Sequence, residues 1–284
     1  MSAYFLKHHP KSGCIVITGS SKGIGLGLAQ AFLEQQQAVV ISGRNRTDLQ
    51  RTLQQLRHRF PAALIHAVTC DVTQIHEVQM LWDEAIQHFG AVQIWINNAG
   101  SCTATLDFKD LAAADIQTVV QTNIIGSMFG SQVALNGMLA QGYGQIFNME
   151  GWGTRGEWSA GMTAYATTKR AVGYFSQALF KETKQTHIQV GTLSPGMVAT
   201  DLLVSSWQNG DVQHWNKIKR LFLFIIDPPE VVYRYLAQRI LENKRRHTRI
   251  VWMTPLRLLL RFLQPYYWRR NPIKDTALAH LNSK

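Results

Sequence analysis

Short apolar segments alternate with stretches of helical periodicity, and this alternation constrains the fold of the 284-residue chain more than any other feature. The apolar runs lie at 14–18, 38–42, 63–68, 92–96, 145–149, 188–193 and 248–253. Helical patterns separate them, at 23–36, 46–59, 78–89, 115–141, 162–185 and 229–243. This order predicts an α/β fold: one doubly wound parallel sheet of about seven strands, with helices on both faces.

Composition sets the class of protein and the domain limits. Hydrophobic residues make up 46% of the chain and charged residues 17%, which excludes a disordered or coiled-coil chain. We expect one domain over 13–253, an N-terminal tail over 1–12 and a basic helical appendage over 254–284. No segment reaches the roughly 20 apolar residues of a membrane span, and the N-terminus lacks the apolar run of a signal peptide.

Cysteine usage indicates the compartment. The three cysteines are odd in number and far apart, which excludes a disulfide framework and fits a reducing cytosol; they are Cys14, Cys70 and Cys102. No closely spaced Cys/His cluster is present, so no metal is expected. The predicted location is cytoplasmic, peripheral to a membrane if the C-terminal segment binds one.

The basic surplus lies in the last quarter of the chain. Residues 1–216 hold 14 basic and 14 acidic side chains, whereas residues 217–284 hold 15 and 4. Between 255 and 270, arginines are mixed with leucines and aromatic residues, a composition typical of interfacial helices. Either this segment docks on the core with a solvated basic face, or its arginine heads meet a membrane or a hydrophobic partner. Nucleic acid is not expected, because no module that binds it is visible.

A glycine-rich loop follows the first strand and opens the first helix, running from Thr18 to Gly25. Glycines there allow a tight turn and let backbone N–H groups approach a pyrophosphate at the helix N-terminus, as in Rossmann-type domains. The residues expected to contact the dinucleotide in this loop are Thr18, Gly19, Ser21, Lys22, Gly23, Ile24 and Gly25.

The second strand ends in Arg44 and carries no acidic residue that could bind a ribose 2′-hydroxyl. An arginine can meet a 2′-phosphate through a bidentate, charge-assisted pair, and Lys22 adds a second cation. The pattern therefore predicts NADPH as the cofactor. Asp71 and Val72, after the third strand, are expected beside its adenine.

Tyr165 and Lys169 are spaced i, i+4, so they share one face of the predicted helix over 162–185. The lysine charge is expected to lower the pKa of the phenol, which would let it donate a proton near neutral pH. Three further motifs complete the pattern. Asn98-Ala99-Gly100 follows the fourth strand, and Asn123 lies in the long helix after it. Pro195-Gly196-Met197-Val198-Ala199-Thr200 follows the sixth strand.

With these motifs in this order, residues 13–253 resemble the short-chain dehydrogenase/reductase family. The resemblance implies hydride transfer between a nicotinamide and a carbonyl carbon or alcohol. It implies that Tyr165 is the acid/base, that Lys169 binds the nicotinamide ribose and that Asn123 holds a water in the proton relay. It also implies a nicotinamide pocket lined by Pro195, Gly196, Val198 and Thr200, with Asn98, Ala99 and Gly100 contacting the cofactor. A homo-oligomer is expected.

One family feature is missing, the carbonyl-polarising serine about 13 residues before the tyrosine. The positions that correspond are Gly151 and Trp152, and neither has a hydroxyl. Thr154 is the nearest hydroxyl that could turn inward and is our candidate for the role. Glu150 could donate a hydrogen bond only if it were protonated.

The pattern Ile-Phe-Asn-Met-acidic-Gly-x-Gly over 146–153 and Ala-Tyr-x-x-Thr-Lys-Arg over 164–170 resembles the chlorophyll b reductases. That likeness implies reduction of the 7-formyl group of chlorophyll(ide) b to hydroxymethyl. A large flat apolar substrate would meet Glu150, Trp152, Trp158, Met162 and Trp207, with a lid over about 200–228. The alternatives are NADPH-dependent reduction of another hydrophobic aldehyde or ketone, such as a lipid, steroid or retinoid-like compound, and a non-catalytic dinucleotide sensor.

Overall fold

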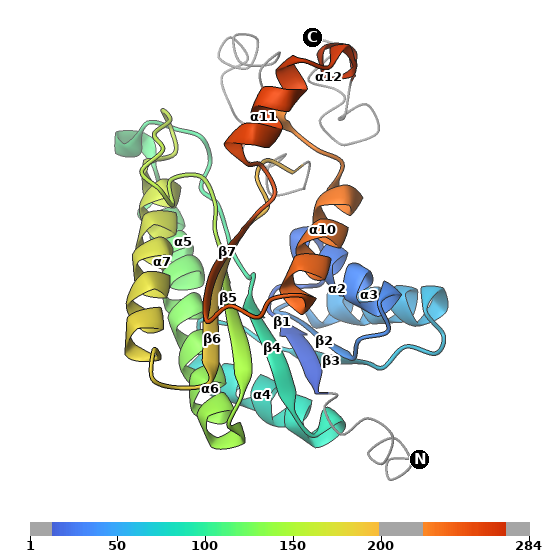
Figure 1. Ribbon diagram of the computed structural model, residues 1–284. Coiled ribbons are helices and arrows are strands. Elements are labelled where there is room, and N and C mark those ends of the chain that lie inside the picture. Colours follow the sequence, from blue (N-terminus) through green and yellow to red (C-terminus); the bar gives the residue numbers. More distant parts are fainter. Residues whose placement is uncertain (1–12, 199–223, 271–284) are drawn as a thin grey trace.

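The computed structural model describes residues 13–198 and 224–270 of the chain and has a seven-stranded parallel sheet at its centre (Figure 1). The strand order is β3-β2-β1-β4-β5-β6-β7, and every neighbouring pair is parallel. The strands are β1 (Cys14–Ile17), β2 (Val39–Gly43), β3 (Ile65–Thr69), β4 (Val92–Asn97), β5 (Gly144–Met149), β6 (Ile188–Ser194) and β7 (His247–Val251). The predicted fold class is confirmed.

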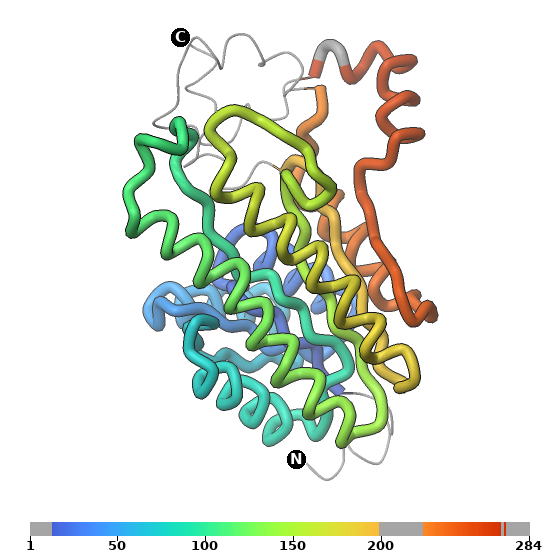
Figure 2. The backbone as a smooth tube through the Cα atoms, turned by 90° about the vertical axis from the view of Figure 1, so that its left-hand side faces the viewer, coloured from blue at the N-terminus to red at the C-terminus, as the bar shows by residue number. Residues whose placement is uncertain are grey.

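Helices cover both faces of this sheet, as the two views in Figures 1 and 2 show. On one side lie α2 (Gly23–Glu34), α3 (Arg46–Arg59) and α10 (Pro229–Leu241). On the other lie α4 (Ile75–Phe89), α5 (Ala113–Val120), α6 (Gly126–Gln141) and α7 (Thr163–Glu182). Side chains alternate between the two layers along β1, where Ile15 and Ile17 pack with α2 and α10, and Val16 with α4 and α6. Burial on both faces explains why the strands are continuous apolar runs.

The long helix expected over 115–141 is interrupted. A π-helical turn, Gln121–Ile125, joins α5 to α6 and carries Asn123 in its middle. The Ser127 hydroxyl donates to the Asn123 carbonyl at 2.7 Å, and the Asn123 side chain is bonded to neighbouring segments. Single π-turns inside helices are frequent at functional sites, and helical periodicity alone does not reveal them.

Sheet topology indicates where a ligand would bind. The strand order reverses at β1, which lies between β2 and β4, so the loops that leave β1 and β4 diverge. In open α/β sheets ligands bind outside the carboxyl ends of the strands at such a switch point. Thr18 and the glycine loop follow β1 there, and Asn98 follows β4.

The C-terminal segment docks on the rest of the domain through a buried ion cluster. Its helices are α11 (Pro255–Phe262) and α12 (Pro265–Arg269). The Asp227 carboxylate accepts bonds from Arg261, from Arg270 at 3.0 Å and from the Trp252 indole at 2.5 Å. Arg257 lies over the Trp252 ring at 3.9 Å. Within the described ranges, no helix is long and apolar enough to cross a bilayer.

This docking corrects part of the expectation for 255–270. Arg261 is only 2% exposed, so its guanidinium does not face solvent or phosphates. The leucines lie outward instead, with Leu256 65% and Leu259 58% exposed. The buried Asp227 carboxylate explains the inversion, because a buried charge requires a charged partner.

We predict that Asp227→Ala lowers the free energy of unfolding by about 3–5 kcal/mol, because it leaves Arg261 buried without its counter-ion. Urea denaturation followed by circular dichroism measures the change. Arg51→Ala is the control, since it removes an exposed 3.2 Å ion pair with Asp48 and should change stability little. Equal effects of the two variants would contradict the assigned role of Asp227.

Candidate active site

Hydrogen bonds tie the glycine loop to the segment after β4. The Thr18 hydroxyl accepts the backbone N–H groups of Asn98 and Ala99, both at 3.0 Å. The Asn98 amide donates back to the carbonyls of Thr18 at 2.8 Å and Gly19 at 3.0 Å. These residues were expected to contact the cofactor, and the structure shows that Thr18 and Asn98 also hold the two loops of the switch point together.

The N-terminus of α2 has the shape that a pyrophosphate needs. Gly23 has a left-handed φ of 59°, and nothing lies within 4 Å of where its Cβ would sit. A Cβ on Gly25 would lie 2.6 Å from the Gly19 carbonyl oxygen, so only glycine allows this approach. The helix start therefore presents backbone N–H groups to open space, which fits the phosphates of a dinucleotide.

The residues expected at the adenosine end lie around this loop. Arg44 and Lys22 are exposed, and the Ser21 side chain packs against Gly43, just before Arg44. One oxygen of the Asp71 carboxylate accepts from the Thr73 backbone and hydroxyl, at 3.0 and 2.9 Å. Val72 is buried against Gly126, and Ile24 is half-buried at the first turn of α2.

Tyr165 and Lys169 project from α7 toward the end of β5. The Lys169 ammonium donates to the Met149 carbonyl at 3.2 Å and lies 5.8 Å from the centre of the Tyr165 ring. Asn123 is bound to this helix, because its amide donates to the Thr168 hydroxyl at 2.9 Å. Its side chain also closes a pair of bonds with the Ser101 backbone, at 2.8 and 3.0 Å. The structure thus brings Tyr165, Lys169 and Asn123 together, as expected.

Burial controls the protonation of the pair. Desolvation raises the pKa of the Tyr165 phenol above its ordinary value, with a smaller effect from nearby Cys102. Desolvation also lowers the pKa of Lys169 to about 8. The expected net lowering of the Tyr165 pKa is therefore not found in the chain alone, where burial sets the direction of the shift. The phenol is protonated at neutral pH, the form that donates a proton.

Gly151 lies directly over the Tyr165 hydroxyl. A Cβ built on Gly151 would be 2.3 Å from Tyr165 Oη and 3.1 Å from Lys169 Cε. Gly151 is one of the two positions that correspond to the family's serine, and here backbone alone faces the phenol. No side chain larger than hydrogen fits there without a shift of the tyrosine.

The two substitutes proposed for the serine are engaged elsewhere. The Thr154 hydroxyl donates to the Gly151 carbonyl at 2.7 Å and accepts from its N–H at 3.1 Å, so it closes the 151–154 turn. The Glu150 carboxylate accepts from Arg249 at 2.6–2.9 Å and from the Thr192 hydroxyl at 2.7 Å. In this geometry the Thr154 hydroxyl is used within its own turn, and its role in carbonyl polarisation stays a prediction. The Glu150 carboxylate is bound to residues of β6 and β7, and its contact with a substrate likewise stays a prediction.

The remaining predicted residues are distributed around the site. Pro195 and Val198 are buried after β6, where Gly196 has a left-handed φ of 70°. Met162 is half-buried just before α7, whereas Trp152 is 44% exposed and Trp158 80% exposed. An open groove of about 640 Å³ runs along the outer side of α7, lined by residues that include Ala166, Arg170 and Tyr174. Thr200, Trp207 and most of the expected lid lie outside the described residues.

Sequence reasoning missed three residues. Arg249 on β7 neutralises Glu150 from 99 positions away, and no local pattern reveals that pairing. Cys102 lies close enough to Tyr165 and Lys169 to influence the pKa of both. The adjacent Thr103 hydroxyl is buried and has no hydrogen-bond partner within the described part of the chain. The signal that could have found the last two is their position directly after the Asn98-Ala99-Gly100 motif.

Known proteins agree with this geometry. The family model described as short chain dehydrogenase matches residues 13–211. A chloroplastic protein of Oryza sativa subsp. japonica, named probable chlorophyll(ide) b reductase NYC1, is 34% identical over 275 residues. The alignment covers 90% of this chain and 53% of that protein. The chloroplastic chlorophyll(ide) b reductase NOL of Arabidopsis thaliana is 37% identical over 234 residues, covering 80% and 64%.

Solved structures share the fold. A crystal structure of an actinorhodin polyketide ketoreductase variant with NADPH has a TM-score of 0.73 at 25% identity, covering 84% of this chain and 96% of that one. The chain therefore belongs to the short chain dehydrogenase family. It resembles the chlorophyll(ide) b reductases within it, and it spans little more than half the length of the plant NYC1 protein.

We predict that Gly151→Ala destabilises the protein by about 1–3 kcal/mol, because the new methyl group overlaps the Tyr165 hydroxyl. The cost should fall in a Tyr165→Phe background, where that oxygen is absent. Urea denaturation of the four proteins gives the coupling free energy between the two sites. Arg155→Ala, an exposed change in the same loop, is the control. An equal cost of Gly151→Ala in both backgrounds would show that the overlap is not the cause.

Proposed function

We propose that the chain is an NADPH-dependent reductase of a carbonyl group on a large apolar substrate. The first candidate substrate is the 7-formyl group of chlorophyll(ide) b. The observation that carries the proposal is the protonated Tyr165 phenol beside Lys169, with the backbone of Gly151 alone packed against its hydroxyl. The plant relatives named chlorophyll(ide) b reductase support the choice of substrate.

Each residue has a definite task in this proposal. Bound NADPH supplies the hydride that reduces the carbonyl carbon. Tyr165 donates its proton to the carbonyl oxygen, which develops negative charge as the carbon is reduced. Lys169, charged below about pH 8, orients the nicotinamide ribose and stabilises the phenolate left by proton transfer. Asn123 fixes the loop at Ser101 against α7 and holds the relay water that the family resemblance implies.

Carbonyl polarisation needs a donor other than a serine. With Thr154 closing its own turn and Glu150 bound to Arg249, the Tyr165 hydroxyl is the first candidate donor to the carbonyl oxygen. The Thr103 hydroxyl is a second candidate, since it is buried next to Cys102 without a partner among the described residues.

We predict that Tyr165→Phe lowers kcat by about 100- to 10,000-fold while NADPH still binds, because the change removes the proton donor and keeps the ring. Turnover is measured by NADPH oxidation with chlorophyllide b and with a panel of apolar aldehydes and ketones. Tyr174→Phe, a 76% exposed tyrosine on the same helix, is the control. Turnover only with the panel would favour the alternative of another hydrophobic carbonyl. NADPH binding without turnover of any of them would favour the dinucleotide sensor.

We predict that NADPH is preferred over NADH and that Arg44→Asp reverses the preference. Loss of a charge-assisted pair with the 2′-phosphate should lower kcat/KM for NADPH about ten- to a hundredfold. Arg46→Asp changes a neighbouring exposed arginine at the start of α3 and is the matched control. Equal use of the two cofactors by the unmodified enzyme would overturn the assignment.

We propose that α11 helps the enzyme reach a substrate held in a membrane, through its leucines rather than its arginines. Four leucines are exposed, whereas the arginine at 261 is buried beneath them. The exposed fractions are 65% for Leu256, 58% for Leu259, 48% for Leu260 and 73% for Leu263.

The cytoplasmic location and the homo-oligomer remain predictions, and the plant relatives are named chloroplastic.

We predict that Leu259→Ser and Leu263→Ser each weaken binding to anionic liposomes about tenfold or more, since each removes apolar area from the lipid contact. Co-sedimentation measures this, and raised salt should have a smaller effect than either substitution. Leu64→Ser alters a 44% exposed leucine directly before β3, far from α11 in the sequence, and serves as the control. Unchanged liposome binding in both leucine variants would leave the exposed face to a protein contact.

A further inference from the structure

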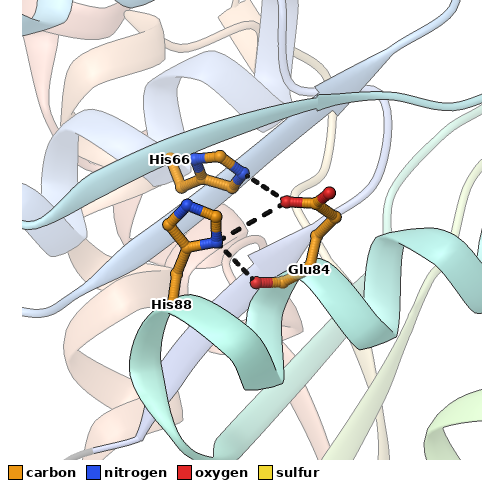
Figure 3. A group of neighbouring side chains, drawn as sticks. All are labelled: His66, Glu84 and His88. Atoms are coloured by element: carbon orange, nitrogen blue, oxygen red, sulfur yellow. Dashed lines mark hydrogen bonds and ion pairs between the residues drawn. The ribbon is translucent and has the colours of Figure 1, made fainter.

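Two histidines and a glutamate converge at an edge of the sheet. His66 lies on β3, the edge strand, while Glu84 and His88 lie one turn apart on α4 (Figure 3). Their side chains are partly exposed, at 23, 44 and 40%, so an ion could enter from solvent. Four strand spacings, about 19 Å, separate β3 from β5 and the active site. The cluster therefore has no part in the chemistry proposed above.

The distances match those between ligands of one tetrahedral zinc ion. The Glu84 carboxylate oxygen Oε2 lies 3.1 Å from His66 Nε2 and 3.6 Å from His88 Nδ1. All three ligand atoms lie within 4.8 Å of one another. Zinc–nitrogen and zinc–oxygen bonds of about 2.0–2.2 Å at tetrahedral angles require ligand separations of roughly 3.3–3.5 Å, a range that the two distances bracket.

The surroundings favour neutral imidazoles, the form that binds a metal. The two histidine rings are stacked, with centroids 3.6 Å apart at 21°, so one ring must turn before both nitrogen lone pairs point at a single ion. Two positive charges at that distance repel each other, so the pair is disfavoured with both rings charged. The groups that a cation would also meet are Arg57, which repels it, and the Glu84 carbonyl, which lies 2.9 Å from His88 Nδ1.

We propose that His66, Glu84 and His88 bind one Zn²⁺ ion and that the ion links the edge strand β3 to helix α4. His66 Nε2, His88 Nδ1 and a Glu84 carboxylate oxygen are the protein ligands, and a water completes the tetrahedron. When zinc binds His88 Nδ1, it takes the place of the proton in the 2.9 Å hydrogen bond between that nitrogen and the Glu84 backbone carbonyl. Two histidines and one glutamate are a set of ligands that zinc uses in proteins. An ion held between a strand and a helix stabilises the folded state by mass action.

The sequence did not predict this site, because only Glu84 and His88 are close along the chain. His66 is 18 positions before Glu84 and is brought to it by the packing of α4 on the edge of the sheet. The criterion of closely spaced cysteines and histidines does not test for ligands that folding brings together. Hydrogen bonds alone are the competing explanation for the cluster, and a metal titration separates the two.

The experiment uses the full chain with His8 and His9 replaced by alanine, so that the N-terminal histidine pair cannot bind metal. Calorimetric titration with Zn²⁺ measures stoichiometry, and Co²⁺ absorbance reports the coordination geometry. Thermal unfolding with and without Zn²⁺ gives an independent readout that needs no activity. The test variants are His66→Ala, His88→Ala and Glu84→Gln. The matched control is His76→Ala, which removes an exposed histidine near Glu77 on the same helix.

We expect one Zn²⁺ per chain, tetrahedral Co²⁺ bands and a Tm that rises with Zn²⁺ in the parent and in His76→Ala. All three signals should disappear in His66→Ala and His88→Ala and weaken strongly in Glu84→Gln. If an alanine variant does not fold, His66→Gln and His88→Gln replace it, since they keep a polar side chain. No saturable binding by the parent, or one-to-one binding retained without His66 and His88, overturns the proposal.

Discussion

Two buried asparagine amides connect the centre of the sheet to the helices that carry the active site. The side-chain amide of Asn97 on β4 donates to the side-chain oxygen Oδ1 of Asn148 on β5 at 2.8 Å and to the Ser131 hydroxyl on α6 at 2.9 Å. The Asn148 amide donates in turn to the Ser176 hydroxyl on α7 at 2.9 Å. All are buried, so an unmade bond would cost about 1–3 kcal/mol. This network therefore favours one arrangement of β4, β5, α6 and α7.

The catalytic geometry follows from that arrangement. Asn148 is three residues before Gly151, and Ser176 lies on the same helix as Tyr165 and Lys169. Holding β5 against α7 places the Gly151 backbone above the phenol and the Met149 carbonyl within reach of Lys169. The network also explains how Asn97 and Asn148 are accommodated in the buried centre of the sheet.

The sequence predicted those parts of the molecule that local patterns control. Apolar runs located all seven strands, and the i, i+4 spacing of Tyr165 and Lys169 placed both on one face of α7. It failed where the partner is distant. Glu150 is neutralised by Arg249 and Arg261 by Asp227, and neither pairing follows from spacing along the chain. The spacing of Thr154 likewise did not indicate that its shortest bond is local, to the Gly151 carbonyl.

The inverted orientation of α11 also changes how the charge of this protein should be understood. Its sequence has a calculated isoelectric point near 9.8, which counts every arginine as if it were in water. Arg261 and Arg270 instead share one carboxylate and the carbonyls of Phe224, Ile225 and Ile226 in the interior. The positive electrostatic field outside the C-terminal segment is therefore weaker than the composition suggests, both for an approaching ion and for the matrix of a column. The protein should therefore elute from a cation exchanger earlier than an unfolded chain of the same sequence.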